Sequence, residues 1–362
     1  MKTKGMLKRI CAVLLGLVLS VAQIPVGAGY IPVAAGTYVA SVTVNGTTTE
    51  YGSFADAIAK LKENSGSTLK LLDNITVEKR IDFSDGKTYT IDFNGYGIML
   101  SESADDTVIR AASGSAVNLI DSRTENRPVH YITLDEYGRG VAVNDSKPTT
   151  GTEGTDYIKV TGGYITGGTG YYDSEDDKSG GAIYAEGSGT KVNLGNISIV
   201  GNIAKFGGGI LVDDGSTFTM QGGKISSNEA KYGGGVYVYG SAFTMKSGEI
   251  LSNEASYGGG VYVSYLDGYR TTFTMEGGEI SLNEAEYGGG VFVYDFFTME
   301  GGKISSNEAA YVGGGVYVNE ESTFTMENGE ISSSTKIPPP NLAMFPTMEM
   351  FPRFTLVPDP SA

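Results

Sequence analysis

The chain has 362 residues, among them 53 glycines and 23 tyrosines but no tryptophan. This composition is unusual for a conventional globular domain and predicts a repetitive β architecture. The 42 acidic residues exceed the 26 lysines and arginines and give a net charge of −16. Such a surface excludes binding of nucleic acid or anionic lipid and favours solubility or cation binding.

Residues 1–28 have the pattern of a secretory signal peptide. Four lysine and arginine residues precede an apolar run from Ile10 to Val21, and the small residues that follow predict cleavage after Ala28. An uncleaved membrane anchor is the alternative, but the run is shorter than the roughly 20 residues that span a bilayer. We therefore expect a secreted or cell-surface protein with no stable membrane insertion after cleavage.

Cleavage would also remove Cys11, which is the only cysteine. The mature chain then has no thiol, which excludes disulfides, thiolate metal sites and cysteine nucleophiles. It keeps 22 lysines and arginines against 42 acidic residues, a net charge of about −20.

Residues 38–100 are predicted to hold an N-terminal cap and the first coils of a solenoid. Ser53 and Asp56 form a capping-box pattern at the start of a short helix. Its apolar residues recur at helical spacing: Phe54, Ala57, Ile58 and Leu61. Because the open end of a solenoid exposes an apolar cross-section and an unpaired strand, we expect this helix to be its lid.

Residues 101–179 fit a repeat poorly and are predicted to form degenerate coils with long loops. The only histidine, His130, lies in one such loop, where an incidental histidine is commoner than a catalytic one. Another stretch gathers four carboxylates of the type that Ca²⁺ prefers: Asp173, Glu175, Asp176 and Asp177. Lys178 stands where an EF-hand loop needs glycine. A calcium site and a solvated acidic loop therefore both stay open, and no other cofactor is expected.

Residues 180–334 are built from regular repeats. Glycine triplets begin at Gly207, Gly233, Gly258, Gly288 and Gly313, about 25 residues apart. Each unit carries three strand-like pieces of the types Gly-Val-Tyr-Val, Phe-Thr-Met and Glu/Lys-Ile-Ser. Alternation places five apolar residues of one unit on one side: Val236, Val238, Phe243, Met245 and Ile250.

One unit buries too little apolar area to offset the ordering of its backbone, so the units must stack. We therefore predict an all-β fold, a right-handed parallel β-helix of about 25-residue coils with a short N-terminal capping helix. Stacking would align equivalent phenylalanines and methionines in the core and equivalent asparagines in an amide ladder at a turn, including Asn202, Asn228, Asn253, Asn283 and Asn307.

Aromatic residues between the inward-facing valines are expected to point outward and form an exposed stripe: Tyr237, Tyr262, Phe292 and Tyr317. Such a stripe could stack on sugar rings or on a protein partner. Mutual reinforcement of neighbouring tyrosines on the sheet is an equally good interpretation. The tyrosines just before the glycines are expected to pack at a coil corner, and residues 335–362 are predicted to be a proline-rich irregular tail.

The repeats between Gly180 and Ser334 resemble the pectin-lyase-like β-helix surface proteins of bacteria, including adhesin passenger domains. The run Gly-Gly-Ala-Ile at Gly180–Ile183 is similar to the signature repeat of chlamydial polymorphic outer-membrane proteins. The matching "ISSN", "ILSN" and "ISLN" segments carry isoleucine where that family has phenylalanine. The resemblance implies a β-helix that binds partners at a cell surface.

Two functions follow from these patterns. The leading hypothesis is adhesin-like binding to a glycan or extracellular protein partner through an acidic, tyrosine-striped face, without catalysis. The alternative is a polysaccharide-degrading glycoside hydrolase or lyase that uses Asp213, Asp214 and a base near Arg127 or Arg270. The pair Asp213-Asp214 also fits a simple polar turn.

Overall fold

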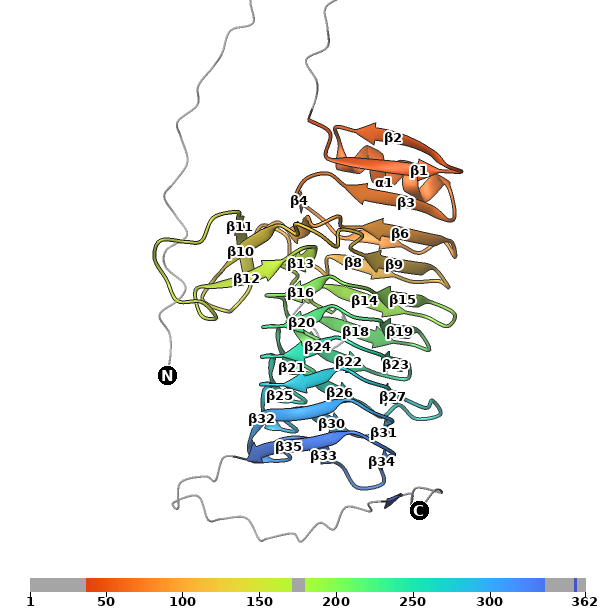
Figure 1. The fold of residues 1–362 in the computed structure, drawn as a ribbon. Helices are drawn as coiled ribbons and strands as arrows, with labels where there is room; N and C mark the ends of the chain where they lie inside the picture. The colour runs from red at the N-terminus through yellow and green to blue at the C-terminus, as the bar shows by residue number, and fades with distance from the viewer. Residues whose placement is uncertain (1–36, 171–179, 336–354, 357–362) are drawn as a thin grey trace, which may run out of the picture. The chain divides into compact units, whose positions relative to one another are not determined.

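The computed structural model describes residues 37–170, 180–335 and 355–356. These residues form a parallel β-solenoid whose coils stack along one axis (Figure 1). The predicted fold of stacked parallel coils with one short helix is therefore confirmed. Predictions that concern residues 1–28, the acidic loop at 173–177 and most of the tail at 335–362 lie outside the described residues.

Sheet A has 12 strands, and its first two are antiparallel to their neighbours. In spatial order these strands are β2 (Thr47–Tyr51), β1 (Ala40–Val44), β3 (Ser67–Leu71), β6 (Thr88–Asp92), β9 (Ala116–Ile120), β15 (Lys191–Leu194), β19 (Thr217–Met220), β23 (Ala242–Met245), β27 (Thr272–Met275), β31 (Phe296–Met299), β34 (Thr323–Met326) and β36 (Thr355–Leu356).

Sheet C has eight parallel strands. They are β5 (Ile81–Phe83), β8 (Ile109–Ala111), β14 (Ile183–Glu186), β18 (Ile210–Asp213), β22 (Val236–Val238), β26 (Val261–Val263), β30 (Val291–Val293) and β33 (Val316–Val318).

Sheet B has two runs of strands that meet in the long strand β32 (Lys303–Val312). The first run is β4 (Ile75–Val77), β7 (Gly97–Leu100), β13 (Tyr164–Thr166), β16 (Ser198–Val200), β20 (Lys224–Ser226), β24 (Glu249–Leu251) and β28 (Glu279–Ser281), with β35 (Glu330–Thr335) beyond β32. The second run is β17 (Ile203–Phe206), β21 (Glu229–Tyr232), β25 (Glu254–Tyr257) and β29 (Glu284–Tyr287).

The second run of sheet B corrects the prediction of three strands per regular coil. The asparagines were expected at a turn, but the chain bends at the residue before each asparagine and after it extends again for four residues. A residue in the left-handed region makes the bend, for example Ser252 with φ of 53°. The alanine of each such strand is buried, with Ala255 7 % exposed.

Equivalent residues stack in register. Phe243 pairs with Phe273, and the rings are parallel within 6° at a centroid distance of 4.8 Å. The five apolar residues predicted to point inward from one coil are all fully buried. The asparagines form the predicted ladder, in which each amide nitrogen donates to the amide oxygen of the next coil, at 2.9 Å between Asn228 and Asn253.

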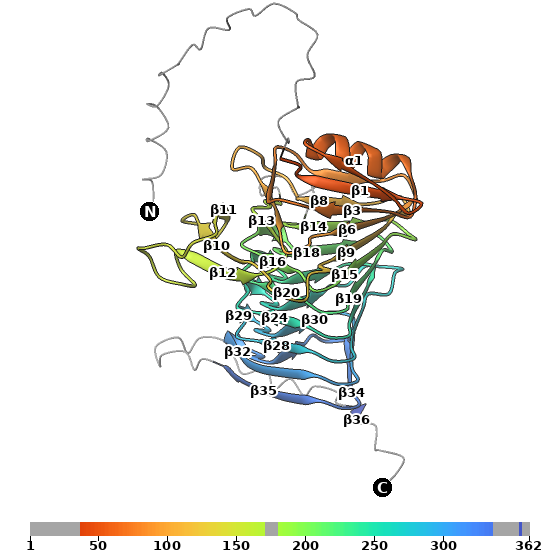
Figure 2. The same ribbon diagram turned by 45° about the horizontal axis from the view of Figure 1, so that its top comes forward.

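The N-terminal end is closed by helix α1 (Phe54–Glu63) and the β1–β2 hairpin (Figure 2). The backbone N–H of Asp56 donates to Ser53 Oγ at 3.3 Å, and Ala57 and Leu61 are buried against the core. The helix contacts β1 and β3 as a lid would, which confirms its predicted role. The antiparallel hairpin was not predicted.

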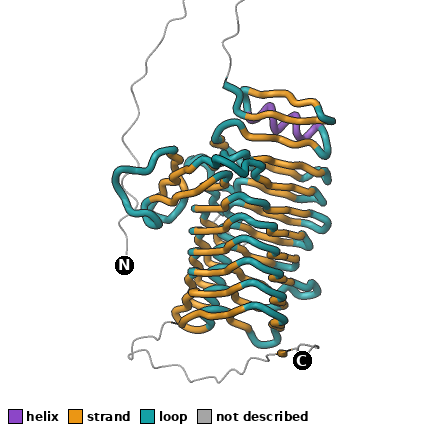
Figure 3. The backbone as a smooth tube through the Cα atoms, in the orientation of Figure 1, coloured by secondary structure: helices purple, strands orange, loops and turns teal. Residues whose placement is uncertain are grey.

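Three strands between β9 and β13 form a separate antiparallel sheet, β11 (Gly140–Asn144), β10 (Val129–Leu134) and β12 (Tyr157–Thr161). It projects sideways from the stack in both ribbon views and in the tube view of Figure 3. Part of the segment predicted as degenerate coils is thus an inserted sheet. His130 lies on β10, not in a loop, and only 1 % of its surface is exposed.

Candidate functional site: an outer aromatic face

Two columns of stacked rings lie outside the core, where the second run of sheet B meets sheet C. We call them the sheet C column (Tyr237, Tyr262, Phe292 and Tyr317) and the sheet B column (Phe206, Tyr232, Tyr257, Tyr287 and Tyr311), and both together the outer aromatic face. Parallel pairing in register produces the columns, because each coil repeats an aromatic residue at the same two positions. Tyr311 is the exception, since the register shifts there and Tyr287 pairs with Val312, but its ring still contacts Tyr287 at 5.0 Å.

A glycine triplet joins the two columns within each coil. Gly258 adopts the left-handed region with φ of 66°, which turns the chain sharply between Tyr257 and Tyr262. A Cβ on Gly259 would lie 2.6 Å from the carbonyl oxygen of Glu284 in the next coil. Glycine is therefore required here by both backbone conformation and close packing, and the turn brings the two aromatic columns together.

The rings of each column lie nearly parallel except at the last pair, which is tilted by 31° in the sheet B column and by 32° in the sheet C column. In the sheet C column, Tyr237 and Tyr262 lie 5.3 Å apart, and Tyr262 and Phe292 lie 4.9 Å apart. In the sheet B column, Tyr257 lies 5.3 Å from Tyr232 and from Tyr287. The columns also meet edge to face, as Tyr257 does with Phe292 at 5.7 Å. This arrangement supports the interpretation that neighbouring aromatic residues reinforce the solenoid.

The predicted exposure of the sheet C column is wrong for three of its four members. Tyr237, Tyr262 and Phe292 point away from the core as expected, but each is at most 8 % exposed. Tyr317 is half-buried. The sheet B column covers these rings, although its tyrosines were expected only to pack at a coil corner. Whether the four rings contact a partner stays a prediction, although the accessible rings belong to the other column.

The sheet B column presents the accessible aromatic surface. Tyr232, Tyr257 and Tyr287 are half-buried, and Tyr311 is 44 % exposed. Burial raises the pKa of Tyr287 above its usual value, with smaller contributions from neighbouring tyrosines and the Glu286 carboxylate. On this face the aromatic ring of Tyr287 therefore lies beside a carboxylate.

A column of glutamates lies on the same strands. Glu229 pairs in register with Glu254, and Glu254 with Glu284. Burial raises the pKa of the Glu229 carboxyl, and the charge of Glu254 raises it further. In the described part of the chain, no group of three or more metal-ligating side chains could hold a metal ion.

The residues of the enzyme hypothesis do not converge. Asp213 ends β18 and is 4 % exposed, and its Oδ1 accepts the backbone N–H of Asp214 at 2.7 Å. Asp214 has φ of 53°, so the pair forms a turn between sheets C and A. Arg127 lies at a different corner, where its Nη2 donates to the carbonyl of Asn196 between sheets A and B. Arg270 lies over the ring of Phe296 at 4.0 Å.

His130 holds the inserted sheet against the solenoid. Its Nε2 lies 2.8 Å from the carbonyl oxygen of Gly95, and its Nδ1 lies 3.0 Å from Asp145 Oδ1. The ring also contacts Tyr164 at 5.0 Å. Because both nitrogens are occupied and the ring is buried, this histidine has a structural role.

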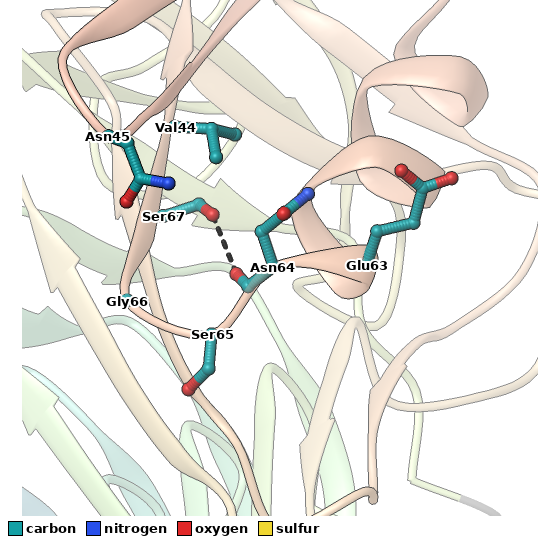
Figure 4. Close-up of a pocket in the computed structure, with 7 residues that line it drawn as sticks. All are labelled: Val44, Asn45, Glu63, Asn64, Ser65, Gly66 and Ser67. Carbon is teal, nitrogen blue, oxygen red and sulfur yellow. Dashed lines mark hydrogen bonds between the residues drawn. The ribbon is translucent and has the colours of Figure 1, made fainter.

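Two polar hollows are further candidates. One lies beside the cap and is lined by Val44, Asn45 and residues 63–67, with Ser67 Oγ donating to the carbonyl of Asn64 at 2.6 Å (Figure 4). The other lies near the inserted sheet, and two of its charged residues, Lys224 and Glu249, pair with each other at 2.9 Å. Neither hollow brings together an acid and a base suited to catalysis.

Comparison with protein-family profiles, with curated proteins and with solved structures gives no match for this chain. Among the described residues, no helix is long and apolar enough to cross a bilayer.

Proposed function

We propose that the chain is a secreted or cell-surface binding protein whose partner, a glycan or an extracellular protein, docks on the outer aromatic face. The observation that carries the proposal is the sheet B column, in which aromatic rings stack at 5.0–5.4 Å across five coils and remain partly accessible. Aromatic rings stack well on sugar rings and on the side chains of protein partners.

The N-terminal sequence supports an extracellular location. Residues 1–28 have the basic and apolar regions of a signal peptide, and the chain beyond them has no cysteine. The net charge of about −20 after cleavage favours a soluble surface and argues against nucleic acid as the partner.

Polysaccharide cleavage has weaker support, because Asp213 is buried in a turn and Arg127 lies at another corner of the coil. Release of reducing sugars from a panel of pectins and host glycans tests it directly. Turnover that is abolished by Asp214→Asn would replace the binding proposal by an enzymatic one.

The binding proposal is tested with the mature protein on an array of glycans and extracellular-matrix proteins. The variant Tyr257→Ser/Tyr287→Ser removes two accessible rings, and we expect it to lose at least about tenfold in affinity for any partner found. Tyr265→Ser is the matched control, because Tyr265 is 53 % exposed but belongs to neither column. Equal binding by all three proteins, or an array without any partner, would refute the proposal.

A further inference from the structure

The first two rings of the sheet B column, Phe206 and Tyr232, contact lysines of the chain itself; we call their coils the upper coils and those of Tyr257 and Tyr287 the lower coils. Lys205 Nζ lies 5.3 Å from the ring centroid of Phe206, and Lys231 Nζ lies 5.1 Å from that of Tyr232. In both cases a lysine that immediately precedes the aromatic residue places its ammonium group over the ring. An aromatic face attracts such a cation electrostatically, so these two positions show how the column seats a lysine side chain.

The lower coils repeat the rings without the lysines. The register aligns Ala230, Ala255 and Ala285, and two residues later it aligns Tyr232, Tyr257 and Tyr287. The position between them, which is Lys205 and Lys231 in the upper coils, is therefore Ser256 in the next coil and Glu286 in the one after.

The two lower rings have the stacking geometry of the upper ones. Tyr257 lies 5.3 Å from Tyr232 and 5.3 Å from Tyr287, and both rings are half-buried. In the part of the chain that the structure describes, cation contacts to the sheet B column occur only at Phe206 and Tyr232. The rings of Tyr257 and Tyr287 are thus available to a cation from another molecule.

Charge favours such a ligand. Glu286 is exposed beside Tyr287, at the position where the upper coils carry lysine. The mature chain has a net charge of about −20, which attracts basic partners over a distance set by the ionic strength. A carboxylate next to an aromatic ring can pair with an ammonium group that lies over that ring.

We propose that Tyr257, Tyr287 and Glu286 seat lysine side chains of a basic segment in a protein partner, in the way that Phe206 and Tyr232 seat Lys205 and Lys231. This inference rests on the proposed function, because it assumes that partners dock on the outer aromatic face. A protein is the favoured source of the cation because the cations that already lie over this column, at Phe206 and Tyr232, are lysine side chains.

The test measures binding of the mature protein to a fluorescent lysine-rich peptide with glycine spacers. A glutamate-rich peptide of the same length and an oligomer of a deacetylated amino sugar serve as comparison ligands. We expect micromolar or weaker binding of the lysine peptide that weakens as salt is added, no binding of the glutamate peptide, and weaker binding of the amino sugar.

Two charge-matched variants decide whether the seat is specific. Glu286→Lys restores the arrangement of the upper coils and should lower the affinity for the lysine peptide at least about tenfold. Glu300→Lys makes the same change in charge at an exposed position after β31, away from the face, and should lower it less than about threefold. Equal losses in both variants would show general attraction to an acidic surface and overturn the inference.

Failure of this inference and failure of the proposed function can be told apart. A partner that is found on the array and lost in Tyr257→Ser/Tyr287→Ser, together with no binding of the lysine peptide, would overturn the lysine seat but leave the docking face standing. Tighter binding of the amino sugar than of the lysine peptide would likewise overturn the choice of a protein partner. Lysine-peptide binding that is lost in Glu286→Lys and in the double tyrosine variant supports both.

Discussion

Replacing Asn253 by alanine should destabilise the solenoid more than any exposed substitution. The Asn253 amide accepts from the backbone N–H and the side-chain nitrogen of Asn228 at 3.1 and 2.9 Å. It also donates to the carbonyl of Ile225 at 3.0 Å and to Asn283 Oδ1 at 2.9 Å. Alanine would leave two buried donors of Asn228 and the Ile225 carbonyl without these partners.

The magnitude follows from the number of groups left unpaired. A buried polar group that loses its partner costs about 1–3 kcal/mol. Three such groups, with some relaxation around the truncated side chain, give a loss of about 3–5 kcal/mol. The variant Asn253→Asp should cost at least as much, because a carboxylate cannot donate to the Ile225 carbonyl or to Asn283 and would be buried next to both acceptors.

Urea unfolding followed by circular dichroism measures the change, and hydrogen exchange locates it. Because coils in a stack contact only their neighbours, protection should fall first in the coils that contain Asn228, Asn253 and Asn283. Asn144→Ala, at an exposed position on β11, is the control and should change stability by less than about 0.5 kcal/mol. A loss below about 1 kcal/mol in Asn253→Ala would show that the amide ladder does not stabilise the fold.

Three further predictions follow from the same coils. Gly248→Ala should cost more than about 2 kcal/mol in urea unfolding, because φ is 98° and the new Cβ would lie 2.7 Å from the backbone carbonyl oxygen of Gly223 in the previous coil. Gly268→Ala, with φ of 78° but open space around it, should cost only about 1 kcal/mol, and equal losses would contradict the packing argument. Burial raises the pKa of Tyr237 well above its usual range. The contribution of this residue to the free energy of unfolding should therefore be fully present below the pKa of an unfolded tyrosine and be lost as the pH rises beyond it. A tyrosinate absorbance signal from this residue before unfolding would contradict this. Burial and the charge of Glu254 raise the pKa of Glu229, so the ionised form of Glu229 opposes folding. Glu229→Gln should therefore raise the melting temperature near neutral pH but not in acid, where the glutamate and the glutamine that replaces it are both uncharged.

Much of the solenoid could be predicted because its repeats align chemically identical residues. Period-two alternation identifies Phe243 and Met245 as core, and the fixed spacing of the repeats places Asn253 over its equivalents, as the structure has them. Stacking gives such short strands partners for their backbone groups in the coils on either side. The helix at Phe54–Glu63 was equally clear because its cap and its apolar face agree.

The inserted sheet was not predicted because it breaks the repeat and pairs antiparallel. Val129–Leu134 pairs with a strand on either side, and no hydrophobic periodicity in these segments predicts that pairing. The burial of His130 has the same origin, since its ring is covered by Tyr164 and bonded to Gly95, more than 30 residues away in each case. Long-range packing of this kind leaves no periodic signal in the sequence.

The exposure of the candidate site was also beyond prediction from alternation. Alternation correctly placed Tyr262 on the side of its strand away from the core, but it does not tell which segment covers that side. The cover comes from the sheet B column of the previous coil, where Tyr232 packs edge to face on Tyr262 at 5.6 Å. The glycine turn, with Gly258 in the left-handed region, sets the two strands of each coil side by side. Outward is therefore not equivalent to exposed where a glycine turn folds one strand beside the next.

The proposed lysine seat depends on the positions at which this chain departs from its repeat. Stacked rings in every coil stabilise the solenoid. If stability alone set the sequence, the residue before each ring would also be the same in every coil. The change from Lys205 and Lys231 to Ser256 and Glu286 serves no evident packing need, because the rings stack at the same spacing above and below it. What it alters is the charge beside the ring, from a built-in cation to an exposed carboxylate. Under the proposed lysine seat, this gradient leaves one end of the column occupied by the chain's own lysines and the other end open to a basic partner, which would also orient that partner along the solenoid axis.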